Sequence, residues 1–425
     1  MGVQGVTCLI WTSCYRCITN CGAGMKTDAP PPNGCRPSGW EPSWPGKAPT
    51  PHERTPERGY HRMKAIPFRV LFLFLTGWLF AFGSGIGHAA GEDNLPGFRL
   101  VQVGALPDDA RYVTVQDARI YFVSQGRPGE NDRLLVAAGD DPRAPTLLGA
   151  FETARGLHAV AIDGPYAYLA NGYQGLMVVR IAKPDQMQEV ARAHEVPYAV
   201  DVVVAKGMAY VAAGDGALHI FDVTEPTQPS WLGVSTIQDY EGKALAVAGD
   251  YAYIASGGRG MRVVDISNPN QPVSVGFYDP PGPELTQDVV VAGDRAYLAQ
   301  KNIRDLTGRL VVLDITNPRI PLEIADHSVV RPALGVAFAD GRVFLAQSDG
   351  GLAAFDVTLP GLPIRLAEYN TSGQAIHVAV GMEGILLADA EGGLRIFHFL
   401  QPTNYLPYIF PSPAQLDEPE PPLLK

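Results

Sequence analysis

Residues 261–269 read MRVVDISNP and residues 310–318 read LVVLDITNP, and in both an apolar run ends in a polar turn and a proline. The same pattern occurs seven times between residue 134 and residue 402, and its prolines are Pro142, Pro184, Pro226, Pro269, Pro318, Pro360 and Pro402. Successive prolines are separated by 42, 42, 43, 49, 42 and 42 residues. Such a constant register over seven copies indicates an internal structural repeat.

Each repeat also contains an aromatic or large apolar residue that, in most copies, lies a few residues after a turn built from Gly, Asp or Lys. These residues are Tyr121, Tyr168, Tyr210, Tyr253, Tyr297, Phe344 and Leu386. Such turns accept positive φ and suit tight hairpins, and no segment shows the 3.6-residue apolar period of a long helix. Four short strands in 42–49 residues is the size of a propeller blade, whereas a β-solenoid would use shorter rungs. We interpret the repeated aromatic residue as a core residue packed between neighbouring blades.

The two ends of the repeat region indicate that the ring is closed. The seventh repeat has only three strand-like runs, whereas residues 99–106, before the first repeat, resemble the fourth strands of the other copies. A strand from the N-terminal side would complete the last blade and leave no open edge. We therefore predict an all-β fold over residues 91–402: a seven-bladed β-propeller of four-stranded antiparallel blades, closed by its N-terminal strand.

Four repeats carry the motif Asp-x-Ser/Thr-x-Pro, which begins at Asp222, Asp265, Asp314 and Asp356. A calcium site is one interpretation of this motif, but each copy offers a single carboxylate, whereas calcium needs several converging oxygen ligands. In the alternative interpretation, the Asp and Ser/Thr side chains accept backbone N–H bonds in a turn, and the proline ends the strand ladder. We favour this structural role.

The strands at residues 261–265 and 310–314, each followed by Ile-Ser/Thr-Asn-Pro, resemble the LVIVD repeat of bacterial and archaeal surface proteins. The resemblance covers residues 98–402 and is strongest in repeats three to six. It is weaker in the first, second and last repeats, where Ala138, Arg180 and His398 replace the Asp. The resemblance implies an exported propeller and supplies no catalytic residues, because the defining motif is structural.

The segment before the repeats has a different composition. All five cysteines lie within the first 35 residues, and prolines crowd residues 30–56. A metal-binding knot around Cys14, Cys17 and Cys21 would need further ligands at suitable spacing. We expect residues 1–62 to be a Cys/Pro-rich leader of low complexity that is disordered or not translated.

Residues 63–90 have the order of a secretory signal peptide. Met63 is followed by the positive charges of Lys64 and Arg69, then by the 13-residue apolar run 70–82 and by small residues ending at Ala90. The run is short for a membrane span, so we expect cleavage after residue 89 or 90, with an uncleaved signal anchor as the alternative. The protein is then secreted or held at the cell surface. The Pro-rich acidic tail, residues 403–425, is expected to be disordered.

The charge of the exported part limits its partners. After residue 90 the sequence has 24 Lys and Arg against 40 Asp and Glu, a net charge of −16. An acidic surface repels phosphate backbones, so we expect no nucleic-acid partner. None of the common catalytic or nucleotide-binding motifs occurs in the repeats, which favours a protein that is not an enzyme and holds no cofactor.

A candidate binding site follows from the register. Nine residues before each aromatic marker lie Tyr112, Ala159, Asp201, Ala244, Asp288, Gly335 and His377, which the fold would place at one level of the central channel. We therefore predict a ligand-binding set of Asp201, Asp288 and His377, with His158 and Lys243 one position earlier in their repeats. Polar residues at a wet channel mouth also occur without any such role. Longer loops at residues 127–132 and 301–308 mark either the binding side or tolerated insertions.

These observations favour an exported, monomeric, non-catalytic propeller that binds an unidentified protein or surface ligand at the cell envelope. The alternative is a metal-dependent propeller hydrolase, similar to lactonases or esterases, in which Asp201, Asp288 and His377 act as ligands or base. A third interpretation is a purely structural component of the envelope.

Overall fold

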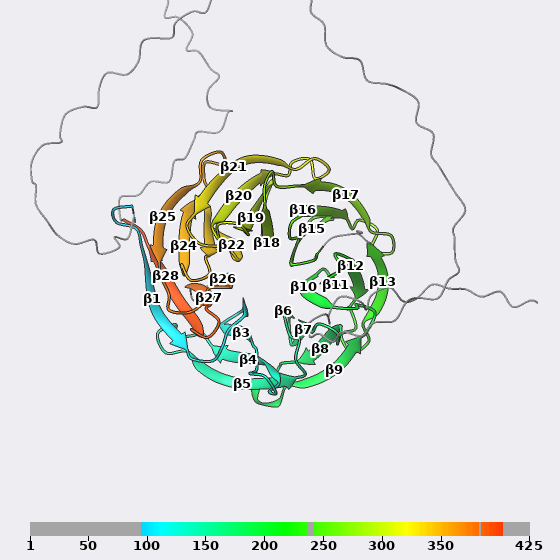
Figure 1. The fold of residues 1–425 in the computed structure, drawn as a ribbon. Helices are drawn as coiled ribbons and strands as arrows, with labels where there is room; N and C mark the ends of the chain where they lie inside the picture. The colour runs from blue at the N-terminus through cyan, green and yellow to red at the C-terminus, as the bar shows by residue number, and fades with distance from the viewer. Residues whose placement is uncertain (1–94, 236–240, 382–383, 403–425) are drawn as a thin grey trace, which may run out of the picture. The chain divides into compact units, whose positions relative to one another are not determined.

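The computed structural model describes residues 95–235, 241–381 and 384–402. These residues form seven four-stranded antiparallel sheets arranged as a ring of blades (Figure 1). The predicted leader, signal segment and C-terminal tail lie outside the described residues. Within the described part of the chain, no helix is long and apolar enough to cross a membrane.

The first four blades follow the chain in order. Blade 1 consists of β2 (Tyr112–Gln116), β3 (Arg119–Ser124), β4 (Asp132–Ala138) and β5 (Thr146–Thr153). Blade 2 consists of β6 (Ala159–Asp163), β7 (Tyr166–Ala170), β8 (Leu176–Arg180) and β9 (Gln188–Ala193), with the short 3₁₀ helix η1 (Pro184–Gln186) before β9. Blade 3 consists of β10 (Ala199–Ala205), β11 (Met208–Ala213), β12 (Leu218–Asp222) and β13 (Ser230–Ser235). Blade 4 consists of β14 (Ala244–Ala248), β15 (Tyr251–Ala255), β16 (Met261–Asp265) and β17 (Val273–Tyr278).

The remaining blades complete the ring. Blade 5 consists of β18 (Glu284–Ala292), β19 (Arg295–Asn302), β20 (Gly308–Asp314) and β21 (Leu322–Val329). Blade 6 consists of β22 (Gly335–Ala339), β23 (Arg342–Ala346), β24 (Leu352–Asp356) and β25 (Ile364–Tyr369). Blade 7 consists of β26 (His377–Gly381), β27 (Gly384–Ala388), β28 (Leu394–Leu400) and β1 (Arg99–Leu106). In each blade the first strand of the repeat lies nearest the centre of the ring (Figure 1).

The predicted ring closure is confirmed. Strand β1 pairs antiparallel with β28, from Arg99 opposite Leu400 to Leu106 opposite Leu394, with a bulge between Gln102 and Gly104. The bounds of β1 agree with the segment that the sequence predicted for this role. Because the strand that completes the last blade comes from the N-terminal side, blade 7 joins the two ends of the repeat region and has four strands like the other blades.

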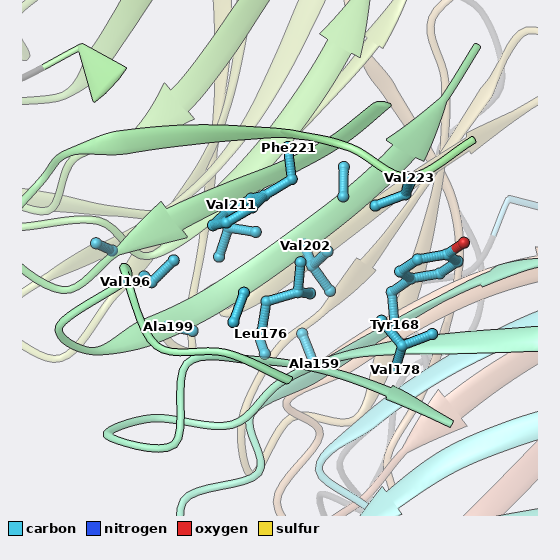
Figure 2. Packing of buried hydrophobic residues seen from close by; sticks show 14 of the residues in the cluster. Ala159, Tyr168, Leu176, Val178, Val196, Ala199, Val202, Val211, Phe221 and Val223 are labelled. Atoms are coloured by element: carbon cyan, nitrogen blue, oxygen red, sulfur yellow. The ribbon is translucent and has the colours of Figure 1, made fainter. Parts of the chain in front are cut away.

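The core is a series of apolar layers between neighbouring blades. All seven markers are at most 7% exposed, which confirms their assignment as core residues. In the layer between blades 2 and 3, Tyr168 and Val178 pack with Val202, Val211 and other buried residues of the next blade (Figure 2). Sheets covered on both faces favour continuous apolar strands, and β8 is accordingly buried at four successive residues.

The repeated prolines have a role between blades as well as within them. In four blades a glycine of the fourth strand lies against the backbone carbonyl of the marker proline of the next blade. A Cβ built on Gly104, Gly149, Gly233 or Gly276 would lie 1.9, 1.8, 2.6 or 2.3 Å from the carbonyl oxygen of Pro142, Pro184, Pro269 or Pro318, respectively. The proline turn of one blade therefore covers the outer strand of the preceding blade at a site that requires a small residue.

The Asp-x-Ser/Thr-x-Pro motifs form local turns. The Oδ1 atom of Asp222 accepts the Thr224 backbone N–H at 2.9 Å and its hydroxyl at 2.7 Å, and Asp265 binds Ser267 in the same way at 3.1 and 2.7 Å. These hydrogen bonds hold the pKa of both exposed carboxyls below the usual value. The Asp side chain therefore accepts a backbone N–H as the structural interpretation predicts, whereas the Ser/Thr hydroxyl donates to the Asp instead of accepting a backbone N–H.

Candidate functional site

A cavity of about 610 Å³ lies at the end of the central channel where the inner strands begin, which we call the mouth face. Inner strands from all seven blades contribute to its wall. All five residues predicted as a ligand-binding set line it, namely His158, Asp201, Lys243, Asp288 and His377. The five side chains therefore share one cavity, as the repeat register predicts. Their role in that cavity stays a prediction.

The two carboxylates connect neighbouring blades. Asp201 accepts the N–H of Val202 through Oδ1 at 2.8 Å and that of Leu245, in blade 4, through Oδ2 at 2.7 Å. Asp288 repeats this arrangement in blade 5, where its second oxygen accepts the N–H of Val336 of blade 6 at 2.8 Å. Both side chains are nearly buried, with 5% and 8% of each residue exposed. Each carboxylate thus satisfies a backbone donor across a blade boundary.

His377 occupies the equivalent position of blade 7. Its Nδ1 atom accepts the N–H of Val113, in blade 1, at 3.4 Å, and its ring stacks on Tyr112 with centroids 4.0 Å apart. Asp201, Asp288 and His377 therefore each contact the same backbone position of the following blade. These contacts cross the boundaries between blades 3 and 4, 5 and 6, and 7 and 1, which gives the three residues a structural role beside any binding role.

Burial shifts the pKa values of Asp201, Asp288 and His377. It raises the pKa of Asp201 to about 7, with a further contribution from the charge of Asp288, and raises that of Asp288 to about 7 as well. Burial lowers the pKa of His377 to about 4. Near neutral pH the histidine is accordingly uncharged, and the two carboxyls are close to their pKa values.

Tyr112 belongs to the same cluster, although it was not part of the predicted set. Its hydroxyl is a hydrogen-bond partner of Asp201, and burial together with the two carboxylates raises its pKa. The side chain thus links blade 1 to blade 3 across the channel. Its place in the repeat, equivalent to that of Asp201, is the sequence signal that could have identified it.

Further residues at the mouth are engaged with one another. His158 shares a 2.8 Å hydrogen bond between its Nε2 atom and the hydroxyl of Tyr198, and burial lowers its pKa. Tyr198 contacts the ring of Tyr173 edge-on, with centroids 4.7 Å apart. Lys243 pairs with Glu241 at 3.0 Å. The mouth therefore carries aromatic and polar groups on the side of blades 2 to 4.

Other lining residues were missed because they come from strand ends and loops outside the two register positions. They include Gln125, Lys301 and Gln374. Lys301 is the first residue of the predicted insertion of blade 5, so this insertion borders the cavity. Part of it continues the hairpin, since β19 extends to Asn302 and β20 starts at Gly308.

The described residues contain no group of three His, Cys, Asp or Glu side chains placed to hold one metal ion. The physical reason is visible at Asp201, Asp288 and His377, because each is directed to a different blade boundary by its hydrogen bond.

Comparisons with known proteins agree with this architecture. The family model described as the LVIVD repeat matches residues 156–194, 198–235, 241–280 and 285–326. The matches include the second repeat, in which Arg180 replaces the Asp of the motif, and leave out the first, sixth and seventh repeats. No curated protein matches the sequence.

Two solved structures resemble the chain in fold. The WD40 β-propeller domain of Doa1 is 12% identical, with a TM-score of 0.56 over 71% of this chain and 96% of that one. The RRP9 WD40 repeats are 10% identical, with a TM-score of 0.55 over 71% and 97% of the two chains. At this identity the likeness shows the fold alone. The chain therefore carries LVIVD repeats, and they form blades 2 to 5 of a seven-bladed β-propeller.

Proposed function

We propose that this propeller is an exported, non-catalytic binding protein of the cell envelope, and that its partner docks on the mouth face. The observation that carries the proposal is the cavity of about 610 Å³ at the channel mouth, bordered by exposed loop side chains. Export is supported by the sequence of residues 63–90 and by the resemblance to surface proteins.

The chemistry of the cavity favours binding over catalysis. A general acid or base must be free to exchange a proton with a substrate, whereas both oxygens of Asp201 and of Asp288 accept backbone N–H groups. The Nδ1 atom of His377 is occupied in the same way. The residues best suited to catalysis are therefore engaged in holding blades together.

The loops of the mouth face expose side chains suited to a partner. Tyr173 is 82% exposed, Val330 76% and Leu306 66%. Leu306 also has a φ of 59°, a left-handed conformation that costs free energy for a leucine. Protein interfaces combine exposed apolar anchors of this kind with a polar rim. Lys301 and Gln125 supply polar groups in the lining of the cavity.

Site-specific photo-crosslinking in the producing cells tests the docking face. A photoreactive phenylalanine analogue replaces Tyr173 in one variant and Trp231 in a matched control, because Trp231 is 45% exposed on the outer strand β13. We expect a discrete cross-linked product at position 173 and none at position 231. Products only at position 231 would contradict docking at the mouth.

A second measurement addresses the hydrolase alternative. The full chain is melted with EDTA, with calcium and with zinc. An ion present at 100 times its dissociation constant would add about 2.7 kcal/mol of stability, enough to raise the Tm by a few degrees. We expect no change with either ion. A clear rise that Asp201→Ala abolishes would restore the metal site and with it the hydrolase interpretation.

A further inference from the structure

We infer that the mouth cavity binds a sugar ring of a neutral saccharide, with Tyr173 as the stacking surface for an adjoining ring. This inference rests on the proposed binding function and names its ligand class. A volume of about 610 Å³ is within the usual range for small-molecule sites and accommodates a sugar ring.

Aromatic groups are placed at two depths of the site. Tyr112 and His377 line the cavity as a stacked pair with centroids 4.0 Å apart. Outside the cavity lining, Tyr173 is 82% exposed, and its ring contacts that of Tyr198, whose hydroxyl shares a hydrogen bond with the cavity-lining His158. The apolar C–H faces of a sugar ring pack on such rings, and a surface fixed before binding loses little conformational entropy.

Polar groups with free hydrogen-bonding capacity complete the wall. The side chains of Gln125 and Lys301 make no hydrogen bond to the described residues, and Gln287 makes only a 3.4 Å contact with the carbonyl of Leu285. An amide side chain donates and accepts at the same time. It can therefore bind neighbouring hydroxyl groups, each of which also donates and accepts.

The charges around the cavity favour a neutral ligand over an anionic one. Asp201 and Asp288 at its wall disfavour an anion. At the rim, Arg111 pairs with Asp109 at 3.0 Å and with Glu391 at 2.8 Å, and Lys243 pairs with Glu241. Arg111 and Lys243 would have to leave these partners to bind an anionic ligand. Among the described lining residues, Lys301 is the cation that makes no ion pair.

Saturation-transfer NMR and titration calorimetry on the full chain test the inference. The probes are maltotriose, cellotriose and N,N′-diacetylchitobiose. We expect at least one probe to bind, with Tyr173→Ala weakening its affinity about tenfold and Gln125→Ala about fivefold. The control Trp231→Ala is expected to leave the affinity unchanged, because Trp231 lies on the outer strand of blade 3.

Absence of binding by all three probes overturns the inference, and so does an equal loss of affinity in the Tyr173 and Trp231 variants. Both results leave the proposed function intact if the photo-crosslink at position 173 still captures a partner. If a saccharide binds but no cross-linked partner is found, the saccharide inference is supported and the docking of a macromolecule on the mouth face is contradicted. Folding does not complicate the comparison, because Tyr173 is exposed and lies in a surface turn.

Discussion

Replacement of Gly149 by alanine is expected to lower the free energy of unfolding by about 2 kcal/mol, the usual cost of forcing an extra carbon into a packed site. The new Cβ would lie 1.8 Å from the carbonyl oxygen of Pro184 and 2.4 Å from its carbonyl carbon. Both atoms belong to backbone, so the turn of blade 2 has to move away from blade 1. A change of side-chain rotamer cannot remove this clash, because the atoms closest to the new Cβ are backbone atoms.

Urea denaturation of the full chain measures this effect. The matched control is Gly361→Ala, because Gly361 lies in the equivalent proline turn of blade 6 and a Cβ there meets nothing within 4 Å. We expect a clear fall of the urea midpoint for the Gly149 variant and almost none for the control. Equal midpoints would mean that the contact between the proline turn and the preceding blade is easily displaced.

A rise in pH from 5 to 8 is expected to lower the free energy of unfolding by about 3 kcal/mol. Asp201 and Asp288 have folded-state pKa values of about 7, above the ordinary value of 3.8. Between these values the folded state holds more protons than the unfolded state, so stability falls as pH rises and the carboxyls ionise within the ring. Most carboxylates in proteins have the opposite effect.

The titration of His377 offsets part of this loss of stability with rising pH. Its folded-state pKa of about 4 lies below the ordinary value of 6.5, so it adds stability as pH rises from about 4 to 6.5. Two carboxyls outweigh one imidazole over that range, and only the carboxyls act above it. Below pH 4 the exposed turn carboxyls, such as Asp222 with its lowered pKa, begin to lose their hydrogen-bonded charged form. Maximum stability is thus expected at mildly acidic pH.

Urea midpoints at a series of pH values test this expectation. Asp288→Asn removes one of the two titrating groups and should flatten the decline between pH 5 and 8. Asp163→Asn, at the exposed end of β6 and outside the cavity lining, should leave the profile as in the parent protein. A parent profile that rises toward pH 8 would show that the two carboxyls are ionised in the folded state at lower pH.

The candidate site was predictable in part. The repeat register brought Asp201, Asp288 and His377 to one level, and the structure places all three at one cavity with His158 and Lys243. The register could not show that each accepts a backbone N–H from the next blade, since this depends on side-chain direction within the inner strand. The register also placed Tyr112 at the level of Asp201, but it could not show that the Tyr112 hydroxyl is a hydrogen-bond partner of Asp201 across the channel.

The sequence by itself determined the number of blades, the order of strands and the closing strand at residues 99–106. These features follow from local chemistry: prolines and Asp-Thr turns end strands at a constant spacing, and the apolar runs between them require burial on both faces. Only the tertiary structure decided that Tyr112 meets Asp201 across the channel and that Tyr198 supports Tyr173 beside His158. Such contacts join different blades, and their distances depend on how the ring closes and how tightly neighbouring sheets pack.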